Sequence, residues 1–166
     1  MAINQAYPVL DGIAPSWAGV IIKCSIYDGA LLDIRDISAI NTGTAVEIGE
    51  QRGASGGRVT RRTTGSATPT ASMTLYRSGY QKLARNLASV APKRGKQRLI
   101  SLVHFDVQVQ HTPEGSDEVY EYRIMGCRVM GRDLNGAEGV DADQVELPIN
   151  TLQIIDIIDG NEVVML

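Results

Sequence analysis

Cysteine, aromatic residues and long apolar runs are scarce in this sequence. The 166 residues include two cysteines, Cys24 and Cys127, and neither belongs to a CxxC pair. We therefore expect buried free thiols rather than a zinc site or a disulfide framework, with oxidation of the pair as the alternative. Aromatic residues make up 5% of the chain, which is little for a protein that stacks RNA bases. No apolar run is long enough to insert into a membrane and no signal-peptide pattern is seen, so we expect synthesis in a reducing cytoplasm.

Acidic residues are absent from Gln51 to Phe105, although the whole chain carries a net charge of −3. That segment holds eleven lysines and arginines, whereas residues 106–166 hold 13 acids and three arginines. A basic segment can bind nucleic acid, or it can meet an acidic surface of the same chain or of another copy. The acidic balance of the whole chain favours the second interpretation. Unlike patches on one chain suit head-to-tail assembly of identical copies.

Motifs that carry catalytic or cofactor chemistry are missing as well. The sequence has no GxxxxGK[ST] phosphate loop, no GxGxxG after a strand and no GxSxG elbow. Asp141 and Asp143 lack the spacing of a calcium loop, and His104 lies alone in a strand pattern. We therefore expect a protein that is not an enzyme and that holds no cofactor or metal.

Strand patterns dominate what is present. Apolar and polar residues alternate, or β-branched residues gather, in five segments. The predicted strands cover residues 17–27, 70–77, 97–112, 119–131 and 144–158. Gly126 marks a possible bulge, and Pro148 favours an edge position or a bulge. Residues 36–49 are expected to form two short strands around a turn at Asn41–Gly43.

One helix is predicted over residues 78–91, with Ser78 as its N-cap and Pro92 ending it. Tyr80, Leu83, Ala84 and Leu87 recur at helical spacing, so one apolar face of this helix is expected to pack on the core. The stretch QRGASGGRVTRRTTG, residues 51–65, has four glycines and no sustained periodicity. We interpret residues 50–66 as a long extended loop or a mobile hairpin that its glycines allow to bend. The prediction for residues 1–166 is a single mainly β domain, an antiparallel β-sandwich or partial barrel with one flanking α-helix.

The order of these segments resembles the tail tube proteins of tailed bacteriophages. The residues that carry the resemblance are AVEIGEQRGASGGRVTRRTTG, ASMTLYRSGYQKLARNL, the hairpin of residues 99–131 and VELPINTLQIIDIIDGNEVVML. The family implies hexameric rings with a continuous inner β-barrel, stacked into a hollow tube for DNA delivery, here in a contractile tail. It implies further copies, a tape-measure protein, sheath, and baseplate or terminator proteins as partners, with phage DNA passing non-specifically. It also implies a place in the virion tail after synthesis in the cytoplasm of a bacterial host.

The glycine- and arginine-rich segment is interpreted as an assembly arm that locks ring to ring or copy to copy. Its arginines would pair with acids of a neighbouring subunit, so changing them to Glu should leave a folded subunit that no longer polymerises. The residues predicted to make these contacts are Arg52, Arg58, Arg61, Arg62, Asp133, Asp141 and Asp143. The alternative is a mobile surface loop without a partner.

A channel for a sliding polyanion should not be lined by lysines, because lysines bind phosphates. Such a channel could instead be lined by Gln, Asn and scattered acids on the polar face of a barrel strand. The residues predicted to face the lumen are Glu47, Asp106, Gln108, Gln110, Glu146 and Asn150. Two other functions remain open: a tube of a type VI-like secretion system or bacteriocin, and a small soluble β-barrel module that binds nucleic acid. The scarcity of aromatic residues argues against the module.

Overall fold

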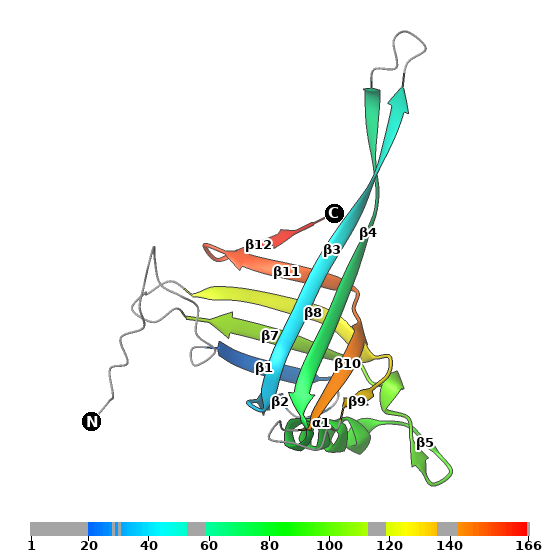
Figure 1. Cartoon of the computed structure of the whole chain (residues 1–166), viewed down its shortest axis with the longest axis vertical. Helices are drawn as coiled ribbons and strands as arrows, with labels where there is room; N and C mark the ends of the chain where they lie inside the picture. The colour runs from blue at the N-terminus through cyan, green and yellow to red at the C-terminus, as the bar shows by residue number, and fades with distance from the viewer. Residues whose placement is uncertain are drawn as a thin grey trace, which may run out of the picture.

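Antiparallel strands make up most of the described chain (Figure 1). The computed structural model describes residues 20–27, 29, 31–52, 59–112, 119–135 and 143–165. The strands are β1 (Val20–Ile26), β2 (Leu31–Ile34), β3 (Ile37–Arg52), β4 (Val59–Tyr76), β5 (Lys93–Arg94), β6 (Gln97–Arg98), β7 (Phe105–His111), β8 (Tyr120–Val129), β9 (Asp133–Asn135), β10 (Gln144–Asn150), β11 (Gln153–Ile158) and β12 (Asn161–Val164). The α-helix α1 (Arg77–Val90) and the short 3-10 helix η2 (Ile100–Leu102) complete them. The predicted mainly β antiparallel fold with one flanking helix is confirmed.

The strands form two packed sheets that share β8. Sheet A has the order β2-β1-β7-β8-β11-β12, and sheet B contains β3, β4, β10 and β9. The two are joined where Arg128 and Val129 of β8 pair with Asn150 and Ile149 of β10. The sheets therefore form a partial barrel that is not closed.

Alternating side chains from both sheets fill one core. Phe105 and Val107 of β7 and Met73 and Leu75 of β4 have no solvent exposure. Leu83 and Leu87 of α1 are buried in the same cluster, which confirms the predicted apolar face of the helix. The period of two in the strands thus places alternate residues in the core. The outer faces are mixed, since Ile21 of β1 and Leu31 of β2 are exposed there among polar residues.

The start of α1 differs in detail from its prediction. The helix covers Arg77–Val90, and Ser78 does not cap it; the Ser78 hydroxyl donates instead to Asp36 Oδ2 at 3.0 Å. A Cβ at Gly79 would lie 2.6 Å from the carbonyl oxygen of Asp36, so this turn packs too closely for a larger residue. The helix ends before Pro92, as predicted.

The prediction of a turn at Asn41–Gly43 is wrong, because β3 runs without interruption from Ile37 to Arg52. The partner strand β4 supplies a continuous ladder, in which Gly43 lies opposite Thr70 and the Thr70 hydroxyl donates to the Gly43 carbonyl at 3.3 Å. Within residues 50–66, the described parts are paired strand rather than loop: 50–52 belong to β3 and 59–66 to β4. Of the two interpretations, the hairpin is therefore correct.

Pro148 lies within β10, between β4 and the strands β8 and β9. Its carbonyl accepts a hydrogen bond from Met130 N at 2.9 Å, on the side away from β4. On that side the ladder with β9 ends at Glu146 and the ladder with β8 begins at Ile149. Proline occupies this gap in the ladder, so the missing N–H removes no sheet hydrogen bond.

Candidate assembly surfaces and channel face

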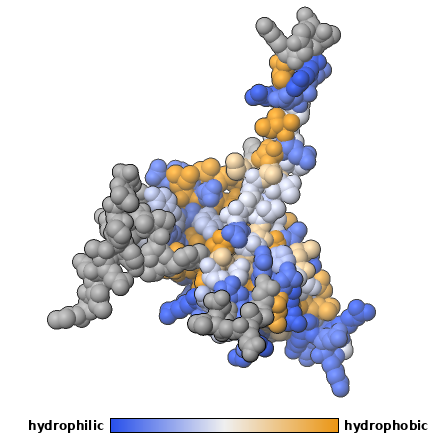
Figure 2. All heavy atoms as spheres, in the orientation of Figure 1, coloured by the Kyte–Doolittle hydropathy of each residue, from blue (hydrophilic) through white to orange (hydrophobic). Residues whose placement is uncertain are grey.

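The outer part of the β3–β4 hairpin stands clear of the body of the molecule (Figures 1 and 2). We call this part, residues 47–52 and 59–66, the arm. Its described side chains are exposed, including 62% of Ile48. An isolated two-stranded ribbon is at best marginally stable in water, because neither face is covered. The arm is therefore the kind of element that gains stability from a neighbouring subunit.

The arginines predicted to make assembly contacts lie on this arm. Arg52 and Arg62 flank the carboxylate of Glu50, at 3.9 and 3.7 Å, and Arg61 lies opposite Gln51 across the ribbon. Ion pairs this exposed contribute little stability, so these arginines remain available to other carboxylates. Arg58 lies outside the described residues.

The acids predicted as their partners are separated in the structure. Asp143 pairs with Arg77 at the start of α1, at 3.0 Å. Asp133 of β9 lies directly opposite Glu146 of β10. The structure thus brings together two acids that the sequence interpretation had assigned to different sites. Asp141 lies outside the described residues.

The residues predicted to face the lumen divide between two faces. Asp106, Gln108 and Gln110 lie on the outer face of sheet A, where they alternate with the buried residues of β7. The other three, on the outer face of sheet B, are Glu47, Glu146 and Asn150. The two outer faces point away from a shared core, so we expect one channel to be lined by one set and not by both.

The outer face of sheet A carries a network of charged and amide groups. Glu121 accepts hydrogen bonds from Gln108 at 2.8 Å, from Gln110 at 3.0 Å and from the Arg123 guanidinium at 3.1 Å. The bond from Gln110, with those from Gln108 and Arg123, holds the pKa of Glu121 below its ordinary value. Lys23 lies opposite Gln108 in the neighbouring strand. This face therefore holds two cations, Lys23 and Arg123, in line across three strands.

Asp106 has a structural role that sequence reasoning missed. Its Oδ1 accepts hydrogen bonds from Gly126 N at 2.7 Å and from the Tyr27 hydroxyl at 3.0 Å. The second bond raises the pKa of Tyr27. Gly126 sits at an irregularity of the β7–β8 ladder with a φ of 64°, which confirms the predicted bulge. The carboxylate thus fixes the bulge.

The outer face of sheet B contains an uncharged block, and its acids Glu47, Asp133 and Glu146 lie outside that block. Residues 37–46 of β3 and residues 67–76 of β4 contain no charged residue at all. The outward side chains of this paired block are small and mostly polar. They include Asn41, Gly43, Thr70, Ser72 and Thr74. The two uncharged segments, ISAINTGTAV and ATPTASMTLY, are visible in the sequence. Only their pairing in the structure shows that they form one uncharged surface.

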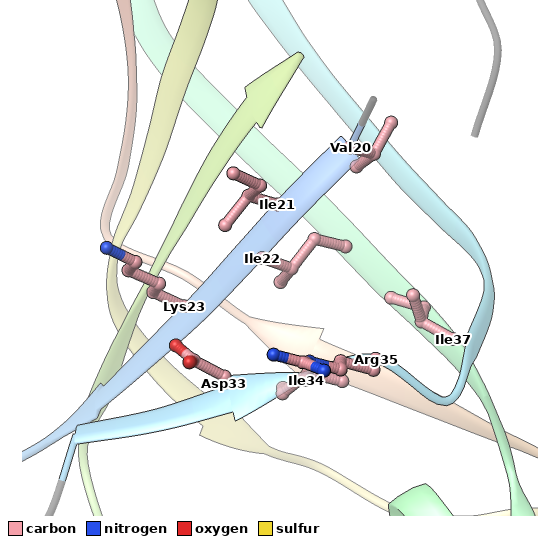
Figure 3. Close-up of a pocket in the computed structure, with 8 residues that line it drawn as sticks. All are labelled: Val20, Ile21, Ile22, Lys23, Asp33, Ile34, Arg35 and Ile37. Carbon is pink, nitrogen blue, oxygen red and sulfur yellow. The ribbon is translucent and has the colours of Figure 1, made fainter. Parts of the chain in front are cut away.

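Two of the surface hollows lie at the borders of the sheets. The larger, of about 570 Å³, lies between β1, β2 and the start of β3 (Figure 3). Its lining consists of Val20, Ile21, Ile22, Lys23, Asp33, Ile34, Arg35 and Ile37. The second, of about 430 Å³, lies between the β3–β4 hairpin and the β11–β12 hairpin and is mainly apolar. Among the described residues, no three His, Cys, Asp or Glu side chains are placed to hold a metal.

Both cysteines are buried and free. Burial, followed by the neighbouring Cys127 and Asp106, raises the pKa of Cys24 from 9.0 to about 12. Burial likewise raises the pKa of Cys127 from 9.0 to about 12. Both thiols therefore stay protonated in the folded protein at neutral pH, and a protonated thiol is a poor nucleophile.

We predict that neither thiol reacts with a disulfide reagent at about pH 8 until the protein unfolds. Above about pH 9 the unfolded chain releases both protons while the folded chain keeps them. The free energy of unfolding should then fall as the pH rises toward 12, by about 1.4 kcal/mol per pH unit for each thiol. Denaturant titrations of the wild type and of a Cys24→Ala/Cys127→Ala variant isolate this slope. Rapid labelling of the folded protein would contradict the prediction.

The structure defines a class of domain: two packed antiparallel sheets, one flanking helix and a long projecting hairpin. No protein-family model and no curated protein matches the sequence. Several solved structures have a similar fold. The sheath/tube terminator of the PVC extracellular contractile injection system, in its extended state, matches with a TM-score of 0.60 at 11% identity, over 89% of this chain and 99% of that one.

Two further structures agree with it. The tube terminating cap of the anti-feeding prophage matches with a TM-score of 0.56 at 11% identity, over 93% of this chain and 97% of that one. The sheath-tube complex of PVC in its extended state matches with a TM-score of 0.56 at 10% identity, over 97% and 95%. At these identities the likeness is one of fold. It covers nearly the whole of each chain.

The described helices offer no candidate for a membrane span, since none combines the necessary length with an apolar sequence.

Proposed function

We propose that this chain is the tube subunit of a contractile tail, in which identical copies form hexameric rings that stack into a hollow channel. It acts as a structural protein of the virion tail, without catalysis, and is made in the cytoplasm of a bacterial host. The observation that carries the proposal is the arm, a ribbon that the described part of the chain leaves uncovered on both faces. The fold shared with tube and terminator structures supports it.

The outer face of sheet B is the best candidate for the wall of the channel. A polyanion such as DNA slides freely only where no cations bind its phosphates. The paired blocks 37–46 and 67–76 carry no charge, whereas the outer face of sheet A carries Lys23 and also Arg123, which is paired with Glu121 and Glu162. In this arrangement Glu47 and Asn150 face the lumen, and Asp106, Gln108 and Gln110 do not. The remaining partners would be a tape-measure protein within the tube, sheath around it and baseplate or terminator proteins at its ends.

Negative-stain electron microscopy of the purified protein, beside size-exclusion chromatography, tests the assembly. Hollow tubes are the expected result. A second candidate function, a subunit that terminates the tube, is favoured by the two terminator structures among those of similar fold. It predicts single rings that do not stack. A monomer at high concentration that binds DNA in a salt-dependent manner would overturn both and favour a nucleic-acid-binding module.

The same tubes test the channel face. In tubes of an Asn41→Cys variant, a small maleimide should label the new thiol, whereas a maleimide on a bulky polymer should not reach it. A matched Lys23→Cys variant on sheet A should react with both reagents. The two native thiols are buried and should not react with either maleimide in the tubes of either variant. The reverse pattern of protection would assign the channel to sheet A.

A further inference from the structure

The small β5–β6 hairpin projects beside α1 and is strongly hydrophilic (Figures 1 and 2). Residues 92–98 are all exposed. Four of them are cations, Lys93, Arg94, Lys96 and Arg98, and the turn between the strands uses Gly95 at a φ of 62°. Among the described residues, none of these cations lies within 4.0 Å of a carboxylate.

The pairing of this hairpin places like charges face to face. Lys93 lies directly opposite Arg98. Side chains at such positions have Cβ atoms about 5 Å apart, and like charges there destabilise the hairpin. The Arg98 guanidinium donates one hydrogen bond to the Ala91 carbonyl, at 3.3 Å, but this does not neutralise it. The stability of the hairpin therefore does not explain its charges, whereas contact with an acidic surface does.

The same chain carries the matching acidic arrangement. Asp133 and Glu146 are exposed and lie directly opposite each other, on β9 and β10. No described cation lies within 4.0 Å of either carboxylate. Both pairs are cross-strand pairs of antiparallel ladders, so in each pair the Cβ atoms lie about 5 Å apart. When the two pairs face each other, each cation can therefore meet one carboxylate.

We infer that the Lys93–Arg98 pair of one subunit docks on the Asp133–Glu146 pair of a second copy of this chain. The junction is head-to-tail, since unlike surfaces meet, and it can therefore close into a ring. It relieves the repulsion within both pairs at once. It assigns Asp133 to a contact with Lys93 and Arg98 rather than with the arm, and it moves Glu146 from the lumen to the subunit boundary. The inference rests on the proposed assembly of identical copies.

Charge reversal tests the contact without altering the balance within each pair. A Lys93→Glu/Arg98→Glu variant and an Asp133→Lys/Glu146→Lys variant each replace one like-charged pair by another, so the thermal stability of the monomer should not change. Each variant alone should need a concentration about 10- to 100-fold higher than the wild type to assemble, because four charges then repel across the junction. A Lys23→Glu variant, which reverses one charge on the outer face of sheet A, serves as the control for charge reversal away from the junction and should assemble as the wild type does.

Rescue is the decisive readout. A 1:1 mixture of the two variants should assemble, because in a ring with alternating subunits every junction again joins opposite charges. The variant carrying all four substitutions should assemble by itself for the same reason. If the wild type forms rings and both single-pair variants do too, this contact is wrong while the tube proposal stands. If the wild type forms no rings, the tube proposal fails first. If the Lys93→Glu/Arg98→Glu variant assembles normally but no longer binds DNA, the hairpin binds nucleic acid and the inference is overturned.

Discussion

Replacing residues 47–66 by Asn-Gly should leave a folded subunit that forms no tubes. Val46 and Ala67 lie directly opposite each other, so a two-residue turn can join them without disturbing the ladder below. Of the removed residues, those that the structure describes are exposed and pair with one another across the ribbon, so we expect the free energy of unfolding to change by no more than about 1 kcal/mol. Assembly, in contrast, should be lost, since the arm is the element that needs a neighbour.

Separate measurements on the shortened subunit distinguish a loss of folding from a loss of assembly. Thermal unfolding and size-exclusion chromatography report whether the shortened subunit is folded, and electron microscopy reports whether it polymerises. An Arg61→Glu/Arg62→Glu variant keeps the ribbon but reverses its charge, and it should polymerise poorly if the arginines provide the contact. Tubes of normal length from the shortened chain would show that the arm is a surface feature without a role in assembly.

Gly126→Ala should destabilise the subunit by about 2 to 3 kcal/mol. Gly126 has a φ of 64°, a conformation that costs an L residue about 1 to 2 kcal/mol. A Cβ there would also lie 2.6 Å from Cδ1 and 3.2 Å from Cβ of Leu152, so the Leu152 side chain must turn away. Leu152 is 76% exposed and can move, which limits the additional cost to about 1 kcal/mol.

Gly160 provides a matched control for this substitution. It has a similar φ of 76°, but a Cβ there would meet nothing within 4 Å. Gly160→Ala should therefore show the backbone cost alone, about 1 to 2 kcal/mol. In a double-mutant cycle, Leu152→Ala should recover the difference between the two glycine variants. Equal losses at Gly126 and Gly160, measured by urea unfolding, would show that Leu152 exerts no constraint on the bulge.

Local patterns in the sequence predicted most of the architecture. The alternation in β7, the apolar face of α1 and the bulge at Gly126 are confirmed, because each depends on residues close together in the chain. The prediction of a turn at Asn41–Gly43 is wrong because the structure there depends on residues distant in the chain. Residues with turn propensity stay extended there because β4, a strand formed by residues 59–76, pairs with them over their whole length.

The candidate site was harder to predict, since alternation shows which residues of one strand share a face but not which sheet the strand joins. Gln108 and Asn150 have the same polar character, yet they belong to opposite walls of the molecule. Asp133 and Glu146 are 13 positions apart in the sequence and become neighbours only through the β9–β10 ladder. The prediction of Ser78 as the N-cap is wrong, and its hydroxyl instead donates a hydrogen bond to Asp36, which is distant in the sequence.

The strand common to both sheets has a mechanical consequence. One end of β8 is hydrogen-bonded to β7 and β11, and the other end, beyond the bulge at Gly126, is hydrogen-bonded to β10. Two sheets held only by side-chain packing can slide past each other under load. Here a force applied along one sheet is transmitted to the other through backbone hydrogen bonds, so the two walls must shift as one rigid unit. A subunit built in this way resists shear between its two walls.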